Sequence, residues 1–252
     1  MEIVYPPVIA AARLMFRALG LRITVTGAEN VPSTGGAVLA SNHVSYLDFI
    51  FCGLAGVQRK RLTRFMAKQE VFAHPVAGPL MRGMHHIPVD RAAGSGSFRE
   101  AMKALKQGEI IGVFPEATIS RSFTVKEIKS GAVRLAMATG TPLIPVALWG
   151  GQRIFTKDIP RDFRTRGRAL TIAVGEPMHP TRADDADQVT VELHERMQAL
   201  LEHAQKTYPD RPAPGQEVPW YPAHLGGSAP TPEEARELDR AELAARAAKR
   251  RR

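Results

Sequence analysis

A histidine and an aspartate five residues apart are the first side chains in this sequence that could do chemistry. Asn42 and His43 follow the apolar run Ala37–Ser41, and Asp48 lies in the helical pattern that comes next. Where a strand gives way to a helix, partial burial and the positive helix end favour a neutral imidazole, the form that a general base needs. Asp48 can accept a hydrogen bond from one ring nitrogen of His43, which leaves the other nitrogen to take a proton from a hydroxyl.

A second polar group surrounds an arginine. A short strand pattern, His86–Val89, leads into Asp90 and Arg91. An arginine just past the end of a strand suits a fork-shaped contact with phosphate, whereas the alternative is a surface turn formed by these two residues. His85 and His86 do not indicate a metal site, because no further ligand cluster at the required spacing accompanies them.

A third polar group follows the buried-strand run Ile110–Phe114. Glu116, Thr118 and Arg121 emerge in the loop after this run. Hydroxyl groups and cations in one loop can cradle a phosphate, and the glutamate can hold a hydroxyl or orient an arginine. A fourth segment, Leu143–Leu148, has the pattern of a core strand with one proline.

Alternating strands and helices must position these groups. The continuous apolar runs are typical of strands covered on both faces. Their alternation with helical patterns predicts one α/β domain with a mixed, mostly parallel sheet of about seven strands flanked by helices. In such sheets, functional residues gather where strands end. The predicted strands are Leu21–Gly27, Ala37–Ser41, Leu62–Ala67, His86–Val89, Ile110–Phe114, Leu143–Trp149 and Ala169–Gly175, and the predicted helices cover residues 44–56, 74–83, 95–107, 130–140 and 185–207.

In this order, the four segments resemble the four motifs of the 1-acylglycerol-3-phosphate (lysophosphatidic acid) acyltransferases, a family of glycerolipid acyltransferases. The family motifs are Asn-His-x4-Asp, an arginine preceded by Gly and Ile, Phe-Pro-Glu-Gly-Thr-Arg-Ser, and an apolar strand with a central proline. The resemblance covers roughly residues 20–180. The matching residues in motif order are Asn42, His43 and Asp48; Gly83, Ile87 and Arg91; Phe114, Pro115, Glu116 and Thr118; and Ile144, Pro145 and Val146.

The resemblance implies transfer of a fatty acyl chain from acyl-CoA or acyl-acyl carrier protein to a lysophospholipid hydroxyl, above all that of 1-acylglycerol-3-phosphate, to give phosphatidic acid. It implies His43 as the general base and Asp48 as the residue that fixes its tautomer, without an acyl-enzyme, a metal or a cofactor other than the co-substrate. The implied substrate-binding residues are Asn42, Arg91, Glu116, Thr118 and Arg121.

Two residues depart from the family pattern. Ala117 stands where the family usually has glycine, a mild change unless the backbone there needs a positive φ. Ile119 stands where the family usually has the phosphate-binding arginine, and Arg121 is the candidate replacement. We therefore expect Arg121→Ala to weaken binding of the phosphate-bearing acceptor more than it slows the bound complex. The same departure keeps open a related acyltransferase that acts on a glycolipid or another hydroxylated lipid.

Composition restricts the function classes further. The 252 residues are 44% apolar, enough for a sizeable core, and the single cysteine, Cys52, excludes a disulfide framework. The 34 Lys and Arg against 25 Asp and Glu give a net charge of +9, which predicts an anionic partner. A non-enzymatic nucleic-acid-binding protein is the weaker alternative, because the chain has no recognised nucleic-acid motif and is only 6% aromatic.

The sequence divides into an N-terminal helix (1–20), an acyltransferase domain (21–208) and a Pro/Gly-rich extension (209–252) that ends in a basic helix. The extension's helix is expected to begin in a capping box at Thr231–Glu234. The N-terminal helix suits either a membrane interface or packing on its own domain, and the two readings weigh equally. No apolar run reaches the ~18 residues of a membrane span.

The implied acceptor lies in a bilayer, so the enzyme is expected to be peripheral, on the cytoplasmic face of an anionic membrane. Basic residues near a bilayer contribute roughly 1 kcal/mol each to this attachment. The candidates are the basic runs Arg59–Arg61 with Arg64 and Lys68, and Arg161–Arg168.

Overall fold

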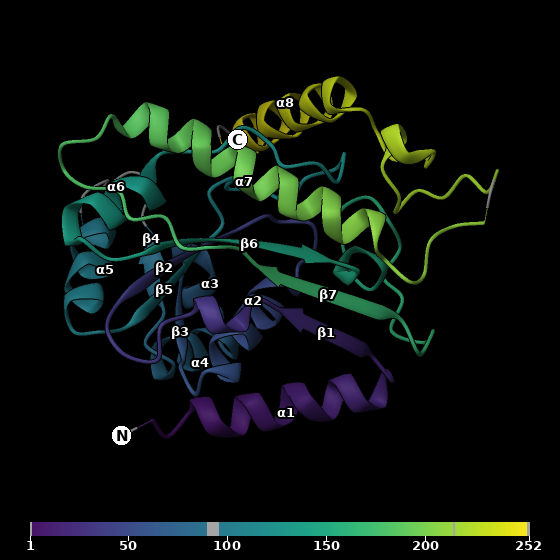
Figure 1. The fold of residues 1–252 in the computed structure, drawn as a ribbon. Coiled ribbons are helices and arrows are strands. Elements are labelled where there is room, and N and C mark those ends of the chain that lie inside the picture. The colour runs from purple at the N-terminus through teal and green to yellow at the C-terminus, as the bar shows by residue number, and fades with distance from the viewer. Residues whose placement is uncertain (1, 90–95, 214, 251–252) are drawn as a thin grey trace.

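Seven strands form one mixed sheet in the computed structural model, which describes residues 2–89, 96–213 and 215–250. The strand order is β1-β7-β6-β2-β5-β3-β4, and every neighbouring pair is parallel except β6 and β7. The predicted mixed, mostly parallel sheet is therefore confirmed (Figure 1). The strands are β1 (Arg22–Thr26), β2 (Ala37–Ser41), β3 (Thr63–Lys68), β4 (Ile87–Val89), β5 (Ile110–Val113), β6 (Leu143–Trp149) and β7 (Ala169–Val174).

Helices cover both faces of the sheet. The described α-helices are α1 (Tyr5–Ala18), α2 (Asp48–Gln58), α3 (Gln69–Ala73), α4 (Ala77–Gly83), α5 (Gly96–Lys106), α6 (Gly131–Thr139), α7 (Ala186–Lys206) and α8 (Pro232–Arg250). Short 3-10 turns lie at Ala28–Asn30, Gly151–Arg153 and Ala223–Leu225.

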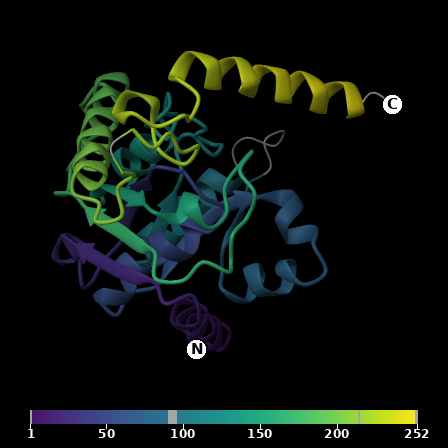
Figure 2. The ribbon, with the colours of Figure 1, turned by 90° about the vertical axis from the view of Figure 1, so that its right-hand side faces the viewer.

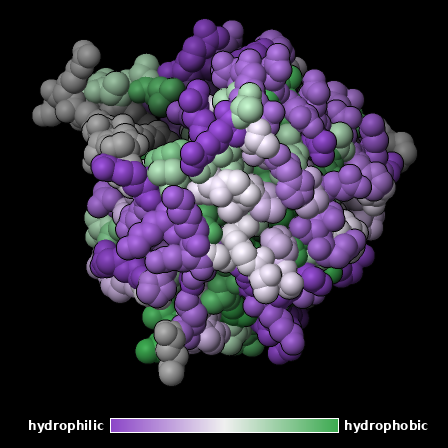
Figure 3. All heavy atoms as spheres, turned by 60° about the vertical axis from the view of Figure 1, so that its left-hand side comes forward, coloured by the Kyte–Doolittle hydropathy of each residue, from purple (hydrophilic) through white to green (hydrophobic). Residues whose placement is uncertain are grey.

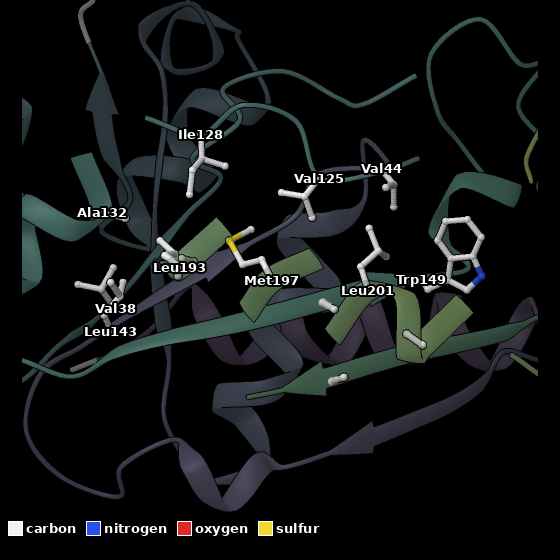
Figure 4. Close-up of a cluster of buried hydrophobic side chains, with 14 of the residues drawn as sticks. Val38, Val44, Val125, Ile128, Ala132, Leu143, Trp149, Leu193, Met197 and Leu201 are labelled. Carbon is white, nitrogen blue, oxygen red and sulfur yellow. The ribbon is translucent and has the colours of Figure 1, made fainter. Parts of the chain in front are cut away.

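Each face of the sheet has its own hydrophobic core, because successive strand residues point to opposite faces. In β6, Leu143, Ala147 and Trp149 face the helices α5, α6 and α7, whereas Ile144 and Leu148 face α1 and α2. Figure 4 shows the first of these cores, where side chains of α7 meet those of β6 and of the loops above it. Strands covered on both faces read as continuous apolar runs, which is why β2, β5 and β6 could be predicted, whereas the edge strand β1 alternates exposed and half-buried residues.

The N-terminal helix α1 packs on the α2 side of the sheet. Phe16 is buried against Phe51 of α2, with ring centroids 5.7 Å apart, and Leu19 is buried beside it. Arg13, Leu14 and Arg17 face outward. One side of this helix therefore belongs to the core, and the opposite side is open.

Two predicted helices begin later than expected. The first turn of the helix predicted at 44–56 is a loop, because Asp48 binds the N–H groups of Val44 and Ser45 and α2 starts only at Asp48. The segment predicted as a helix over 74–83 is helical only from Ala77, because His74 precedes a proline and is extended.

The C-terminal extension is anchored by aromatic contacts and then forms α8. The Trp220 ring lies 6.4 Å from that of Tyr208, and the Arg153 guanidinium lies over Trp220 at 4.4 Å. The predicted capping box is confirmed: the Thr231 N–H donates to Glu234 at 2.8 Å and the Glu234 N–H donates to the Thr231 hydroxyl at 3.3 Å.

Two arginines of the basic runs do not face outward as expected. Arg64 lies on a central strand, 4% exposed, and pairs with Glu2 and Glu109. Arg168 is 9% exposed and pairs with Asp162. Their charges are neutralised within the domain, so neither can contribute to a membrane-facing basic surface.

Candidate active site

The carboxyl ends of three neighbouring strands bring the polar loops together. β6, β2 and β5 are adjacent and parallel, so the residues that follow each of them meet at one edge of the sheet. His43 follows β2, Glu116 follows β5 and the 3-10 turn Gly151–Arg153 follows β6. The arrangement accounts for the proximity of residues separated by more than 70 positions in the sequence.

His43 and Asp48 form a hydrogen-bonded pair at this edge. The His43 Nδ1 lies 3.0 Å from Asp48 Oδ2, which also accepts the N–H groups of Val44 and Ser45 at 2.6 and 2.7 Å. Asp48 is fully buried, and this burial raises its pKa, although the hydrogen bonds from His43, Ser45 and Val44 lower it in part. The aspartate is thus fixed by the main chain and in turn fixes the imidazole.

The imidazole is held on one side and open on another. Its ring stacks on Phe114 at a centroid distance of 4.5 Å, and the His43 side chain is 21% exposed. Because Nδ1 is engaged by Asp48, Nε2 is the nitrogen left for a substrate hydroxyl. The pair can therefore act as a general base.

Glu116 ties the loop after β5 to the histidine. Its Oε1 accepts the His43 N–H at 2.8 Å and its Oε2 accepts the Lys126 N–H at 3.1 Å, while the Ser120 N–H donates to the His43 carbonyl at 2.8 Å. Burial raises the pKa of Glu116 to about 8, although the two N–H donors and the Lys126 charge oppose this. In this structure both oxygens of Glu116 bind the main chain, and its contact with the acceptor stays a prediction.

Asn42 is also held by the main chain. It is 1% exposed, its Nδ2 donates to the Leu148 carbonyl at 3.0 Å and its Oδ1 accepts the Leu148 N–H at 2.7 Å. The side-chain amide thereby continues the pairing of β2 with β6 by one residue. In this structure Asn42 positions His43, and its contact with the substrate stays a prediction.

The remaining predicted binding residues, Thr118, Arg121 and Arg91, differ in where the structure places them. Thr118 is half-buried, and its Oγ1 accepts a hydrogen bond from Lys126 Nζ at 2.7 Å. Arg121 lies beside the same loop but pairs with carboxylates, among them Asp239 of α8. Arg91 lies outside the described residues. The structure thus brings His43, Asp48, Glu116 and Thr118 together and directs Arg121 toward the C-terminal helix.

Cys52, one turn after Asp48, is not a nucleophile at this site. Its side chain is fully buried, and burial together with the Asp48 charge raises the pKa of the thiol to about 12. Ser45 donates its hydroxyl to the Phe155 carbonyl at 2.7 Å. Cys52 and Ser45 are the two possible nucleophiles near His43 in the sequence, and neither is free to attack a substrate.

The alanine in the glycine position of the third motif is strained. Ala117 has φ = 61°, which lies in the left-handed region. The expectation of a mild change is therefore corrected, since that expectation depended on a negative φ.

We predict that Ala117→Gly raises the free energy of unfolding by about 1 kcal/mol, because glycine adopts this φ without strain, even though it also has more freedom in the unfolded chain. Urea unfolding measures the change. Ala104→Gly, in the last turn of α5, is the matched control and should lower stability, by at most roughly 1 kcal/mol. Loss of stability in Ala117→Gly would contradict the strain.

Some residues around the histidine could not be recognised from sequence. Phe114 reads as the end of a buried strand, and only the structure shows its ring against His43. Gly151 has a clearer signal, since it is the second glycine directly after a strand. A Cβ at Gly151 would lie 3.0 Å from both Ser45 and Phe51, a tight contact that favours glycine where the two loops approach each other.

Comparisons with known proteins agree with this geometry. Residues 22–149 match the family model described as Acyltransferase. The chain is 32% identical over 184 residues to a 1-acyl-sn-glycerol-3-phosphate acyltransferase of Bacillus subtilis (strain 168), a match that covers 71% of this chain and 83% of the relative. An enzyme of the same name from Borreliella burgdorferi is 28% identical over 156 residues, with 60% of each chain covered.

A solved structure has the same fold. It is the crystal structure of the 1-acyl-sn-glycerophosphate (LPA) acyltransferase PlsC from Thermotoga maritima, which superimposes with a TM-score of 0.67. The alignment covers 82% of this chain and 80% of that chain at 22% identity.

Proposed function

The chain belongs to the acyltransferase family of enzymes, and from this premise we propose that it transfers a fatty acyl chain from a thioester to 1-acylglycerol-3-phosphate. The product is phosphatidic acid, and the donor is acyl-CoA or acyl-acyl carrier protein. The observation that carries the proposal is the hydrogen bond of 3.0 Å between His43 and the buried Asp48 at the carboxyl edge of the sheet.

The mechanism follows from the two ring nitrogens of His43. Nε2 removes the proton from the acceptor hydroxyl as the hydroxyl oxygen attacks the thioester carbonyl. The resulting imidazolium is stabilised by Asp48, and it can return the proton to the thiolate that leaves. The acyl group passes directly from sulfur to oxygen, so Cys52 and Ser45 have no covalent part.

An apolar groove on the α1 and α2 side of the sheet supports an acyl-chain substrate. The groove lies between α1, α2 and β3, with Ile9, Gly53 and Phe65 in its wall. Phe65 stacks at 6.0 Å on Phe114, the ring that lies against His43. The groove therefore starts two aromatic rings away from the imidazole.

We predict that Gly53→Leu selects against long acyl donors. A Cβ at this position would lie 3.8 Å from Phe65, so a leucine fits on the helix but fills the groove. Transfer of palmitoyl groups should fall at least about fivefold relative to octanoyl groups, the effect expected from overpacking of roughly 1 kcal/mol. Competition between the two thioesters measures the ratio.

The matched control for this prediction is Gly131→Leu, at the start of α6, where a Cβ would meet no described atom within 4 Å. This variant should keep the parent's chain-length preference. Equal losses with both donors in Gly53→Leu would show that the groove does not hold the acyl chain.

The exposed side of α1 supports peripheral attachment to a membrane, which we propose for the cytoplasmic face. Leu14 on this helix is 67% exposed and Ile3, which precedes the helix, is 76% exposed. Val76, which precedes α4, and Leu80, within α4, are also exposed. Figure 3 shows hydrophobic surface gathered at the bottom of the view, where the N-terminal part of α1 lies. Arg13 and Arg17 on the same helix suit anionic lipid headgroups. Among the described residues, no helix has both the length and the apolar character of a membrane span.

A thiol-release assay with products identified by mass tests the proposed function. Acyl-CoA and acyl-acyl carrier protein are offered in turn with lysophosphatidate, an uncharged monoacylglycerol and a glycolipid. The proposal expects phosphatidic acid from lysophosphatidate and little product from the others. Preferential acylation of the glycolipid would instead favour the related acyltransferase that the substitution by Ile119 leaves open, and no turnover of any thioester would refute the proposal.

A further inference from the structure

The C-terminal helix α8 is attached to the domain mainly through charged side chains. Among the α8 side chains that the structure describes, only Ala235 is buried, and Leu238 and Leu243 are exposed. Asp239 and Glu242 are half-buried and follow Ala235 by four and seven residues, so these three share one face of the helix. Figure 2 shows α8 running along the outside of the domain, apart from the sheet. Burial of apolar surface therefore contributes little to its position.

Three cations of the domain meet this face, and we call them the cation cluster: Arg121, Lys126 and Lys157. Arg121 pairs with Asp239 and, at 2.8 Å, with Glu242. Lys126 pairs with Asp239, and Lys157 lies 3.0 Å from Glu242. The cation side chains are only 8%, 21% and 11% exposed, so each sits in a site that needs a nearby anion.

The cation cluster borders the main chain of the catalytic histidine. The residue before Arg121 donates its N–H to the His43 carbonyl at 2.8 Å. The residue before Lys157, Thr156, donates its hydroxyl to the Val44 carbonyl at 2.6 Å. The two loops that carry these cations are thus bonded to the segment that carries the imidazole.

The cation cluster also lies near the position where this chain lacks the arginine of the family pattern. Ile119, in place of the usual phosphate-binding arginine, is 3% exposed and packs into the core. The positive charge near the third motif is carried instead by Arg121 and Lys126, and Lys126 reaches Thr118 at 2.7 Å.

We propose that the cation cluster binds a phosphate group of a substrate, and that Asp239 and Glu242 occupy this site as internal anions until the substrate displaces them. The inference rests on the proposed function and adds to it the headgroup site and the segment that competes for it. Among the described residues, the pair of Arg121 with Asp158 is the one ion pair of the cluster that remains when α8 is displaced, so three cations and one carboxylate give a net charge of +2. A phosphate monoester carries about −1.5 to −2 at neutral pH and matches that charge.

Exchange of one anion for another is physically reasonable here. The carboxylates of α8 satisfy the cations in the free enzyme, and the phosphate oxygens of a substrate restore charge-assisted hydrogen bonds when α8 leaves. Because the helix is held by ion pairs, its release also becomes easier as the salt concentration rises.

Hydrogen exchange of α8, followed by mass spectrometry on the full chain, tests the displacement without turnover. The probes are hexanoylglycerol-3-phosphate, hexanoylglycerol and coenzyme A. We expect the phosphate-bearing acceptor to accelerate exchange in α8 about tenfold and the uncharged compound to leave it unchanged. Acceleration by coenzyme A alone would support the site and assign it to the donor's phosphates. Unchanged exchange with all three probes would overturn the proposal.

The double variant Asp239→Asn/Glu242→Gln provides the kinetic test. Without internal competitors, KM for the phosphate-bearing substrate should fall about tenfold while kcat stays the same. Glu233→Gln, in an exposed pair with Arg236 on the same helix, is the matched control and should change neither constant. A higher KM or a lower kcat in the double variant would show that α8 is a structural clamp and would refute the proposal.

The two proposals can fail separately. If hydrogen exchange responds to the phosphate-bearing probe but no phosphatidic acid forms, the proposed function is wrong and the phosphate site stands. If phosphatidic acid forms but exchange in α8 never responds, the enzyme activity stands and the phosphate site is refuted.

Discussion

Replacement of His43 by alanine is expected to lower the rate of acyl transfer by a factor of about 10² to 10⁴, the contribution of a positioned general base. The imidazole is the group that Asp48 orients, and its remaining nitrogen is open to the acceptor. The loss should appear in kcat, because the interactions of the His43 side chain within the described part of the chain are local: the stack on Phe114 and the pair with Asp48. Thiol release with saturating lysophosphatidate measures it.

Cys52→Ala is the matched control for this variant. The cysteine lies one turn beyond Asp48, is fully buried and has a thiol whose pKa is raised to about 12 by burial. Most of the activity should therefore remain in Cys52→Ala. If instead Cys52→Ala is inactive and His43→Ala is active, acyl transfer proceeds through a cysteine and the general-base mechanism is wrong.

Asp48→Asn is expected to lower kcat by a factor of about 10² to 10⁴ with little change in KM. The asparagine has nearly the same shape, but its single carbonyl oxygen cannot replace the negative charge that stabilises the imidazolium. The carbonyl oxygen of the carboxamide can take the place of Oδ2, which accepts from His43, Val44 and Ser45, and its NH2 then lies at the position of Oδ1, which has no hydrogen-bond partner among the residues that the structure describes. The substitution therefore removes the charge and can keep the hydrogen bonds. Steady-state kinetics at saturating donor measures the change.

The control for Asp48→Asn is Asp184→Asn. Asp184 likewise accepts a main-chain N–H, that of Thr181 at 2.6 Å, but in an exposed turn. This variant should keep the parent's kcat. A kcat in Asp48→Asn within a factor of two or so of the parent would mean that the carboxylate charge takes no part in the reaction.

The elements of the fold and the dyad could be predicted because their signals are local. Strands covered on both faces read as apolar runs, and β2 and β6 agree with the predicted ranges. His43 and Asp48 are five residues apart, so the motif alone places them within reach of each other. The capping box at Thr231 is equally local and was correctly predicted.

The roles of the flanking residues could not be predicted because they depend on distant partners. Asn42 pairs with Leu148, more than a hundred positions away. The Asn-His-x4-Asp motif, from which Asn42 was predicted to bind substrate, does not include Leu148. Arg121 is similar, since its carboxylate partners on α8 are separated from it by a Pro/Gly-rich segment without periodicity. Spacing predicts which residues lie near the histidine, whereas burial and pairing determine what they contact.

A double-mutant cycle at the two dyad positions tests the central claim most directly. Single-turnover acyl transfer to lysophosphatidate, with enzyme in excess, is compared among the parent, His43→Ala, Asp48→Asn and the double variant. If Asp48 acts only through His43, the double variant should be as slow as His43→Ala alone, so that the second substitution adds almost nothing. A double variant that is slower than His43→Ala by the full factor lost in Asp48→Asn would show that the two residues act independently, and would contradict the dyad.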